Sequence, residues 1–585
     1  MFVLALALLV GTTVLAEFRS YAQPDIAFLL DAGGRVLDGA RLYVDVVEIN
    51  PPLVIALNVA VVWIARTLGL SEILVYRVGF TAVLLGSLWL TAGLLRGLLG
   101  HDLRLRRVLV VAIALVLFPL AGVDFGEREH LVLALLLPYL LLATGRLAGR
   151  AMANAPAAAL GLLAGLAIAL KPHFILVWFA IEVLLRGSRK VRPRAILPES
   201  LAVAGFLVTY VLLILLLTPA YVDLLRLLAI PYAHFLHEPF LQLLVTGPGA
   251  VLAVFALLAF AALRPQARHP AVWAVFALAT AACLVAGAAQ QKGLRYHFYP
   301  AFSLATVVLA LVSADGVIAV HKPVRAIYRS LVAGVLAATV TVACVRQALR
   351  AVGREDDPGR AQFERLVDVV RSRAQGAGVF VMSYHLQSAY PLINYAHARS
   401  ASRFPHLWLL AAEYLDALKG DRPLQFHEPA EMSPGERYLN RAVLEDLGRR
   451  PRLLVVFRNA RDLPVNGFRR LDYIAYFGRD AAIGSILREY QLVAQTGDYL
   501  VYQWVPASAR RVEAAPRPTP GTADAVPVAG GGRGFAVGDP VLLAGVLAFL
   551  GGVAAAWRSN RVPREDSSSP QGSGQPRLVE GAPGE

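Results

Sequence analysis

Five ionisable side chains fall within seven residues of the segment AGVDFGEREHLVLALLLPYL (121–140), between two long apolar runs. They are Asp124, Glu127, Arg128, Glu129 and His130. Carboxylates in such a cluster would hold a hydroxylated ligand or a divalent cation such as Mg²⁺ or Mn²⁺. Arg128 would neutralise Glu127 or Glu129 on the same helical turn. Ionisable groups beside a bilayer are costly and usually line a cavity or a substrate path, so the segment predicts a polar site at the mouth of a membrane span.

A second group of acids lies near the N-terminus, in EFRSYAQPDIAFLLDAGGRVLDGARLYVDVVEINPPL. It contains Asp25, Asp31, Asp38, Asp45 and Glu48. Taken singly, such carboxylates are often only solvated. Taken together with the first cluster, they predict a site in which Asp25 accepts a proton from an attacking hydroxyl.

Cationic and histidine side chains occur in three later segments: KPHF (171–174), YAHFLHEP (232–239) and QQKGLRYHFYP (290–300). Those able to hold a phosphate or diphosphate are Lys171, His173, His234, His237, Lys292, Arg295 and His297. The competing interpretation is structural, with Lys171 and His173 extending toward water from a helix end and the aromatic residues forming an interface belt. A carboxylate base opposite a cation-stabilised phosphate leaving group is the chemistry of sugar transfer from a lipid phosphate.

The elements that would position these residues are membrane spans. The chain has 585 residues, of which 57% are hydrophobic and 17% charged, an unusual balance for a soluble protein. Runs such as VLVVAIALVLFPLAGV lack the polar face of a soluble amphipathic helix and are long enough to cross a bilayer. We predict an α-helical polytopic protein with about twelve spans. They are 1–17, 76–97, 106–123, 130–146, 155–171, 173–187, 199–218, 248–263, 271–289, 298–313, 330–348 and 540–556.

The charge pattern predicts which loops face the cytoplasm. With the N-terminus inside, the loops rich in arginine and lysine all fall on one side, as the positive-inside rule requires. The formal net charge of +15 therefore reflects orientation and not nucleic-acid binding. This solution requires 52–68, which starts at the proline pair Pro51-Pro52, to lie at the membrane surface. The first apolar run could also be a cleaved signal peptide, but it has no basic n-region, and an uncleaved span is favoured.

Residues 349–510 differ from the rest of the chain. They are charged and contain short β-type runs, and YQLVAQTGDYLVYQWV predicts a hairpin with a Gly-Asp turn. We therefore predict a transmembrane domain at 1–348 with an outer loop at 18–75, and an extracytoplasmic α/β domain at 349–510. A flexible linker at 511–539, the last span at 540–556 and a disordered cytoplasmic tail at 557–585 would follow. Cys283 and Cys344 lie inside apolar runs, which argues against a disulfide framework.

With these motifs in place, the sequence resembles the GT-C superfamily of membrane glycosyltransferases, which includes protein O-mannosyltransferases and aminoarabinose transferases. The likeness lies in PDIAFLLDAGGRVLDGARLYVDVVEINPPL, with an acid soon after the first span, and in VDFGEREH about a hundred residues later. LKPH and QKGLRYHFYP resemble later segments that contact the lipid-linked phosphate. The chain departs from the pattern at Asp25-Ile26, where many relatives have Asp-Glu, and at Glu48-Ile49-Asn50.

The resemblance implies an inverting glycosyltransferase that uses a polyprenyl-phosphate sugar donor, in a bacterial inner membrane, with its site facing the periplasm or the outside. Asp25 would be the catalytic base. Glu48, Asp124, Glu127 and Glu129 would serve the acceptor or a divalent cation, and Lys171, His173, His237, Lys292, Arg295 and His297 would bind the donor phosphate. The alternatives are a transporter or lipid flippase, and a non-catalytic partner in envelope assembly. The acceptor and the sugar are left open.

Overall fold

The computed structural model describes residues 2–506, except 101, 192–195, 264–266, 316–322, 353–357, 421–423 and 459–470. The predicted linker at 511–539, the predicted span at 540–556 and the tail at 557–585 lie outside the described residues.

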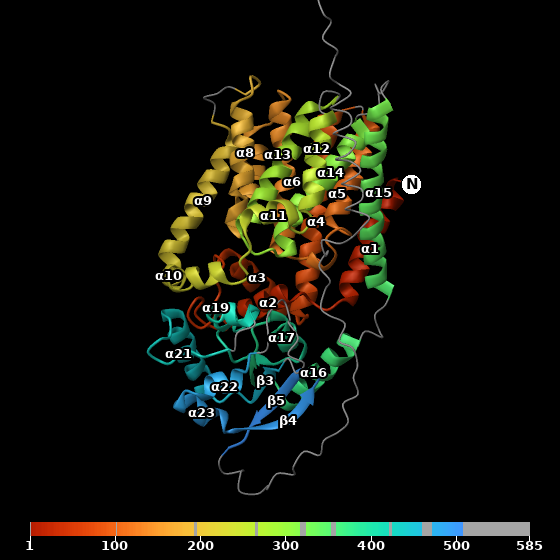
Figure 1. The fold of residues 1–585 in the computed structure, drawn as a ribbon. Coiled ribbons are helices and arrows are strands. Elements are labelled where there is room, and N and C mark those ends of the chain that lie inside the picture. The colour runs from red at the N-terminus through yellow and green to blue at the C-terminus, as the bar shows by residue number, and fades with distance from the viewer. Residues whose placement is uncertain are drawn as a thin grey trace, which may run out of the picture.

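A bundle of apolar helices forms the larger part of the molecule, with an α/β domain below it (Figure 1). Each span predicted before residue 349 corresponds to a helix of this bundle. The bundle helices are α1 (Phe2–Arg19), α4 (Glu72–Leu99), α5 (Leu103–Leu117), α6 (Arg128–Leu147), α7 (Asn154–Leu170), α8 (Ile175–Arg186), α9 (Pro198–Leu217), α12 (Ala250–Leu263), α13 (Pro270–Ala289), α14 (Tyr299–Asp315) and α15 (Pro323–Val352).

Fewer of these helices are long enough to cross a bilayer than the sequence suggested. Within the described residues, seven are long and apolar enough, or eight if the bent pair of α11 (Phe240–Thr246) and α12 is one span. The axes of that pair differ by 72°. The other predicted spans are short: α5, α7 and α8 have 15, 17 and 12 residues. At roughly 1.5 Å per residue they reach about 18 to 26 Å, less than the hydrocarbon core.

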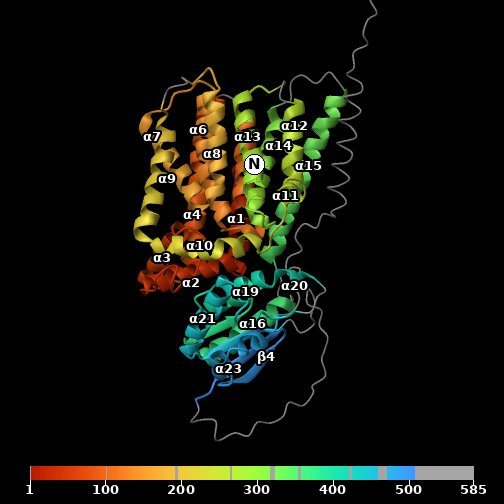
Figure 2. The ribbon, with the colours of Figure 1, turned by 60° about the vertical axis from the view of Figure 1, so that its left-hand side comes forward.

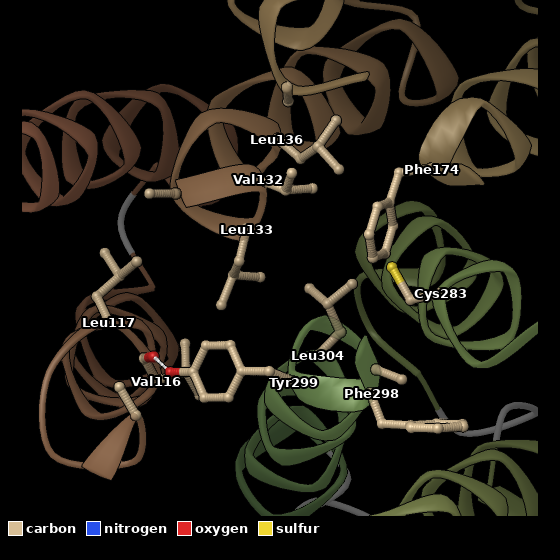
Figure 3. Packing of buried hydrophobic residues seen from close by; sticks show 14 of the residues in the cluster. Val116, Leu117, Val132, Leu133, Leu136, Phe174, Cys283, Phe298, Tyr299 and Leu304 are labelled. Atoms are coloured by element: carbon tan, nitrogen blue, oxygen red, sulfur yellow. Dashed lines mark hydrogen bonds between the residues drawn. The ribbon is translucent and has the colours of Figure 1, made fainter. Parts of the chain in front are cut away.

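The core of the bundle lies between α5, α6, α13 and α14, where apolar side chains from all four helices meet (Figure 3). Leu133 and Leu136 of α6 face Leu304 of α14 and Cys283 of α13, and all four are buried. The hydroxyl of Tyr299 donates a hydrogen bond to the carbonyl oxygen of Val116. This bond joins the start of α14 to the end of α5.

Three helices lie across one end of the bundle instead of along it: α2 (Pro24–Leu37), α3 (Leu53–Leu68) and α10 (Pro219–His234) (Figure 2). We call this end the site end. The surface helix predicted at 52–68 is α3. It packs closely on α2, because a Cβ on Gly33 would lie 2.8 Å from the carbonyl carbon of Asn58. Only glycine allows the two backbones to approach to this distance.

The α/β domain contains one sheet of five strands in the order β2-β1-β3-β5-β4. Its strands are β1 (Gly378–Met382), β2 (Arg399–Ser400), β3 (Leu453–Phe457), β4 (Tyr490–Thr496) and β5 (Tyr499–Trp504). β1 pairs in parallel with β2 and β3, and β5 pairs antiparallel with β3 and β4. The β4–β5 hairpin confirms the predicted Gly-Asp turn, and Gly497 has the positive φ of 57° that favours glycine.

The helices of the domain are α16 (Pro358–Ala374), α17 (Leu386–Ala389), α18 (Leu392–Tyr395), α19 (Trp408–Glu413), α20 (Leu415–Lys419), α21 (Pro434–Gly448), α22 (Tyr473–Gly478) and α23 (Ala481–Leu487). The domain is held against α2 by polar contacts. The hydroxyl of Tyr390 donates to Asp31 at 2.8 Å, and the side-chain amide of Asn394 donates to the carbonyl of Ala27 at 3.0 Å. The α/β domain therefore helps to position α2.

Candidate active site

Asp25 lies in the first turn of α2, directly after Pro24. Proline suits this position because the first amides of a helix have no partner inside it, and a carboxylate is favoured there by the helix dipole. Its Oδ1 lies 3.8 Å from Nη2 of Arg128. Burial raises the pKa of Asp25, and the charges of Arg128 and Lys171 oppose that rise. Asp25 is thus a carboxylate with more affinity for a proton than an exposed aspartate has.

The acidic segment seen in the sequence packs directly against α2. It runs from the short helix η1 (Gly122–Asp124) to the start of α6. Gly126 has a φ of 91°, and a Cβ there would lie 2.5 Å from Cδ1 of Ile26, the residue after Asp25. The hydroxyl of Tyr76 donates to the carbonyl of Gly126 at 2.6 Å. These contacts bring the two acidic regions of the sequence together.

Glu127 is the residue directly before α6 and is buried. Burial raises its pKa well above the usual value for glutamate, and the nearby negative charges of Asp25 and Glu129 raise it further. Carboxyl groups whose charges repel one another do not both ionise readily. The site can therefore hold a proton on one carboxyl while the other acts as a base.

Glu129 forms a buried ion pair with Lys171. Lys171 follows the last residue of α7, and its Nζ lies 3.0 Å from Oε1 of Glu129. Nε2 of His297 lies 3.8 Å from the same oxygen. Burial lowers the pKa of Lys171, Arg128 lowers it further, and Glu129 opposes the change. The structure thus joins one predicted acid with two predicted phosphate-binding residues.

Asp124 and Arg295 form a second ion pair, with 2.8 Å between Oδ1 and Nη2. Burial raises the pKa of Asp124, and Arg295 opposes that rise. Arg295 opens the short helix η4 (Arg295–Phe298), which leads into α14. The guanidinium side chain is 35% exposed and the carboxylate only 11%, so Arg295 forms the more open side of the pair.

Arg128 has the largest unused hydrogen-bonding capacity in the site. Arg128 is 8% exposed, and its Nε and Nη1 atoms have no hydrogen-bond partner within the described part of the chain. Oε2 of Glu129 and Nδ1 of His297 also lack a partner there. Buried polar atoms in native structures are nearly always paired. These atoms are therefore available to hydrogen-bond a polar ligand or water.

Four predicted site residues do not form ion pairs within the cluster around Asp25 in the described part of the chain. They are Lys292, Glu48, His173 and His237. Nζ of Lys292 donates to the backbone carbonyls of Tyr232, Ala233 and Phe235 at the end of α10, and burial lowers its pKa to about 8. Glu48 accepts hydrogen bonds from the backbone and side chain of Asn50, although its charge still acts on Asp25.

The other two of these four residues are His173 and His237. Both are exposed, and so is His234, which lies near His237 in the sequence. His173 lies two residues after Lys171, and although much of its surface is accessible, partial desolvation of its ring and the Lys171 charge lower its pKa. His237 donates its backbone amide to the carbonyl of His234 at 3.1 Å. The structure therefore does not bring His237 into the cluster around Asp25.

His130, the last residue of the acidic segment, has a structural role. It is fully buried, and its Nε2 lies 2.9 Å from the carbonyl oxygen of Leu117. Its Nδ1 accepts from the amide of Gly126 at 3.4 Å. The ring also packs edge-on against Phe80, Phe125 and Tyr299.

A divalent cation remains a prediction. Among the residues that the structure describes, no group of three or more His, Cys, Asp or Glu side chains is arranged to hold a metal ion. The nearest acids are instead paired with Arg128, Lys171 and Arg295.

Two residues outside the predicted site set also lie in this cluster. Arg128, for which the sequence indicates a neutralising role, lies inside the acidic segment, and that position is a signal for ligand binding. Tyr296, for which an interface belt is the competing interpretation, has its ring centroid 5.9 Å from Nζ of Lys171 and interacts electrostatically with Asp25, Glu127 and Glu129. Its position between Arg295 and His297 was the available clue.

No protein-family model matches the chain, and no curated protein matches it. Among solved structures, the chain is similar to ArnT from Cupriavidus metallidurans, with 14% identity, a TM-score of 0.47, and coverage of 85% of this chain and 96% of that one. It is also similar to the arabinofuranosyltransferase AftD from Mycobacteria, with 16% identity and a TM-score of 0.43. That match covers 85% of this chain but only 40% of AftD. The chemistry open to this chain depends on the side chains of its own site.

Proposed function

We propose that the chain is an integral-membrane glycosyltransferase that moves a sugar from a polyprenyl-phosphate donor to an acceptor on the extracytoplasmic side of a bacterial inner membrane. The observation that carries the proposal is the pairing of Asp25 with Arg128, a buried arginine with two unused donors, in one cluster of opposite charges at the site end. A base next to an anion-binding group is what this transfer needs.

The positions of these groups support the following reaction. The acceptor hydroxyl gives its proton to the carboxylate of Asp25, whose raised pKa suits it to this role. The acceptor oxygen forms a bond to the anomeric carbon from the side opposite the phosphate, so the configuration inverts. The bond between that carbon and the phosphate oxygen breaks, and its electron pair leaves with the polyprenyl phosphate.

The cationic groups would stabilise the charge that develops on the phosphate. Arg128 offers two unpaired nitrogens, Nε and Nη1, which together carry three N–H groups, and His297 offers Nδ1. Lys171 is held in place by Glu129 at 3.0 Å, and Arg295 by Asp124 at 2.8 Å. Donors fixed before the reaction are worth more than mobile ones, because the site does not have to reorganise as the charge appears. Glu127 and Glu48 would face the acceptor.

The test is release of polyprenyl phosphate from radiolabelled polyprenyl-phosphate pentoses and hexoses by the purified protein, with a cell-envelope lipid extract as acceptor. Asp25→Asn should lower the rate by about 10² to 10⁴, the usual contribution of a general base. The matched control is Asp223→Asn, because Asp223 is an exposed acid on α10 with a side chain 75% accessible. Full activity in Asp25→Asn would show that Asp25 is not the base. If the unaltered protein releases no polyprenyl phosphate, the proposal that it is a glycosyltransferase is wrong.

One observation favours a second candidate, a lipid flippase or transporter. Broken helices are common in transporters, and α11 and α12 meet at a 72° bend around Gly247 and Gly249. The ionisable cluster, however, lies at one end of the bundle. Reconstituted vesicles separate the two: a flippase moves a labelled lipid-linked sugar across the bilayer intact, whereas the proposed enzyme cleaves its sugar–phosphate bond.

A further inference from the structure

A cavity of about 370 Å³ lies beside the site, where the end of α1, the start of α4 and the α/β domain meet. Its lining residues are Phe18, Arg19, Ser20, Tyr21, Ser71, Ile73, Leu74, Arg77 and Tyr395. None of the residues assigned to sugar transfer is among them. A smaller cavity shares Tyr21, Ile73 and Arg77 with it and is also lined by Glu17, Ala22, Gln23, Ile26, Tyr76 and Phe125.

The lining is suited to an anion. It contains two arginines and several hydroxyl groups, and none of the described residues that line it is acidic. Nη2 of Arg77 donates to the carbonyl of Ser20 at 2.7 Å, which holds its guanidinium at the cavity wall. Ser71, Ile73 and Leu74 belong to the first turn of α4, where backbone amides have no partner within the helix. The Ser71 side chain does not cap them.

Three described acids lie near the cavity. Glu17 is bound by Arg350 at 2.8 Å, and it also interacts electrostatically with Arg77, so it offsets part of the positive charge of the lining. Glu364 is bound by Arg360 at 3.0 Å and accepts from the hydroxyl of Tyr21, and Glu72 lies 3.7 Å from Arg66. An arginine pair favours phosphate in particular, because guanidinium groups bind its oxygens two at a time.

The rim of the cavity is apolar and belongs to membrane-spanning helices. Phe18 of α1 is 40% exposed and Leu74 of α4 is 36% exposed. Further along the same two helices, Leu15 and Val78 are 46% and 54% exposed. Both helices are long and apolar enough to cross a bilayer. A cationic cavity that opens between two such helices matches an amphiphile, with a phosphate inside and an acyl or prenyl chain along the groove.

We propose that this cavity binds the phosphate headgroup of a membrane lipid, at a site separate from the centre around Asp25. Ser20 and Tyr21 line the cavity and also belong to the four-residue connection between α1 and α2. A bound lipid would fix this connection and hence the first turn of α2, where Asp25 lies. This last consequence rests on the proposed function, whereas binding itself does not.

The experiment measures the lipids retained by the purified full-length protein in native mass spectrometry, with short-chain phosphatidic acid as the probe. Phosphatidylcholine and inorganic phosphate are the comparison ligands. We expect phosphatidic acid to bind at least tenfold more tightly than either. The double variant Arg19→Gln/Arg77→Gln should weaken this binding at least tenfold. Ser71→Trp should also weaken it by filling the cavity without a change in charge, and Arg77→Lys should retain part of it.

Two controls separate this site from the catalytic one. Arg226→Gln removes an exposed positive charge on α10, where the side chain is 76% accessible, and should leave binding unchanged. Asp25→Asn and Arg128→Gln should leave the lipid bound in the cavity in place, even if sugar transfer proves absent from the unaltered protein. Equal binding by the unaltered protein, the double variant and Ser71→Trp would overturn the proposal. Inorganic phosphate binding as tightly as phosphatidic acid would show a site for free phosphate instead.

Discussion

At the scale of single residues, the charge of Arg128 affects the pKa of Asp25. Arg128 lies 3.8 Å from the carboxylate and lowers its pKa, while burial raises it by more. A base works only when ionised. Activity should therefore fall as the pH drops through the raised pKa of Asp25, at a higher pH than the ordinary aspartate value of about 3.9.

Arg128→Gln removes a group that lowers the Asp25 pKa, so the acid limb of the kcat/KM profile should move to higher pH. The measurement is the rate of polyprenyl phosphate release over a pH series for both proteins. A purely structural role for Arg128 would reduce the rate at every pH but leave the limb where it was.

The Glu129–Lys171 pair predicts a cost in stability. Glu129 is fully buried and Lys171 is 6% exposed. Removal of one member of a buried pair leaves an uncompensated charge and typically costs about 3–5 kcal/mol. Glu129→Gln should therefore lower the midpoint of thermal unfolding in detergent, and Glu129→Gln/Lys171→Met should recover a large part of the loss. If the double variant is no more stable than the single one, the loss of stability does not come from an uncompensated charge on Lys171.

At the scale of elements, the position of Asp25 depends on how closely α2 packs on α3. Gly33→Ala would place a methyl group 2.8 Å from the backbone of Asn58, so the two helices must separate. We expect a fall in transfer rate of tenfold or more, because small displacements of catalytic groups have large effects on rate. Gly86→Ala in α4 is the matched control, since a Cβ there meets nothing within 4 Å. Equal activity in both variants would show that this packing does not position the base.

At the scale of the whole molecule, the site end and the α/β domain should face the outside of the cell. Ala482 on α23 and Ala151 in the connection that follows the C-terminal end of α6 are both exposed, and α6 begins at the site end. In a background in which Cys283 and Cys344 are replaced by alanine, Ala482→Cys should react with a membrane-impermeant thiol reagent in spheroplasts. Ala151→Cys should react only after the cells are broken. The reverse pattern would show that the site end and the α/β domain face the cytoplasm, which would contradict the proposed extracytoplasmic site.

Much of the architecture could be predicted from local sequence features. Apolar runs identified the bundle helices, two prolines identified α3 as a separate element, and the Gly-Asp turn identified the β4–β5 hairpin. These predictions succeed because span length, proline geometry and turn conformation are determined within a few residues. Within the described residues, α5, α7 and α8 coincide with predicted spans but have only 15, 17 and 12 residues, because helix length is also limited by the turns that tertiary packing imposes.

The residue types of the candidate site were likewise evident from the sequence, but their partners were not. Lys292 and Lys171 look alike in sequence, yet one is held by carbonyls at the end of α10 and the other by Glu129. The packing of the α/β domain on α2 also joins segments more than 350 residues apart. The sequence by itself determined which elements form and which chemistry they carry. Only the tertiary structure decided which charges meet, because ion pairing depends on distances between side chains that are far apart along the chain.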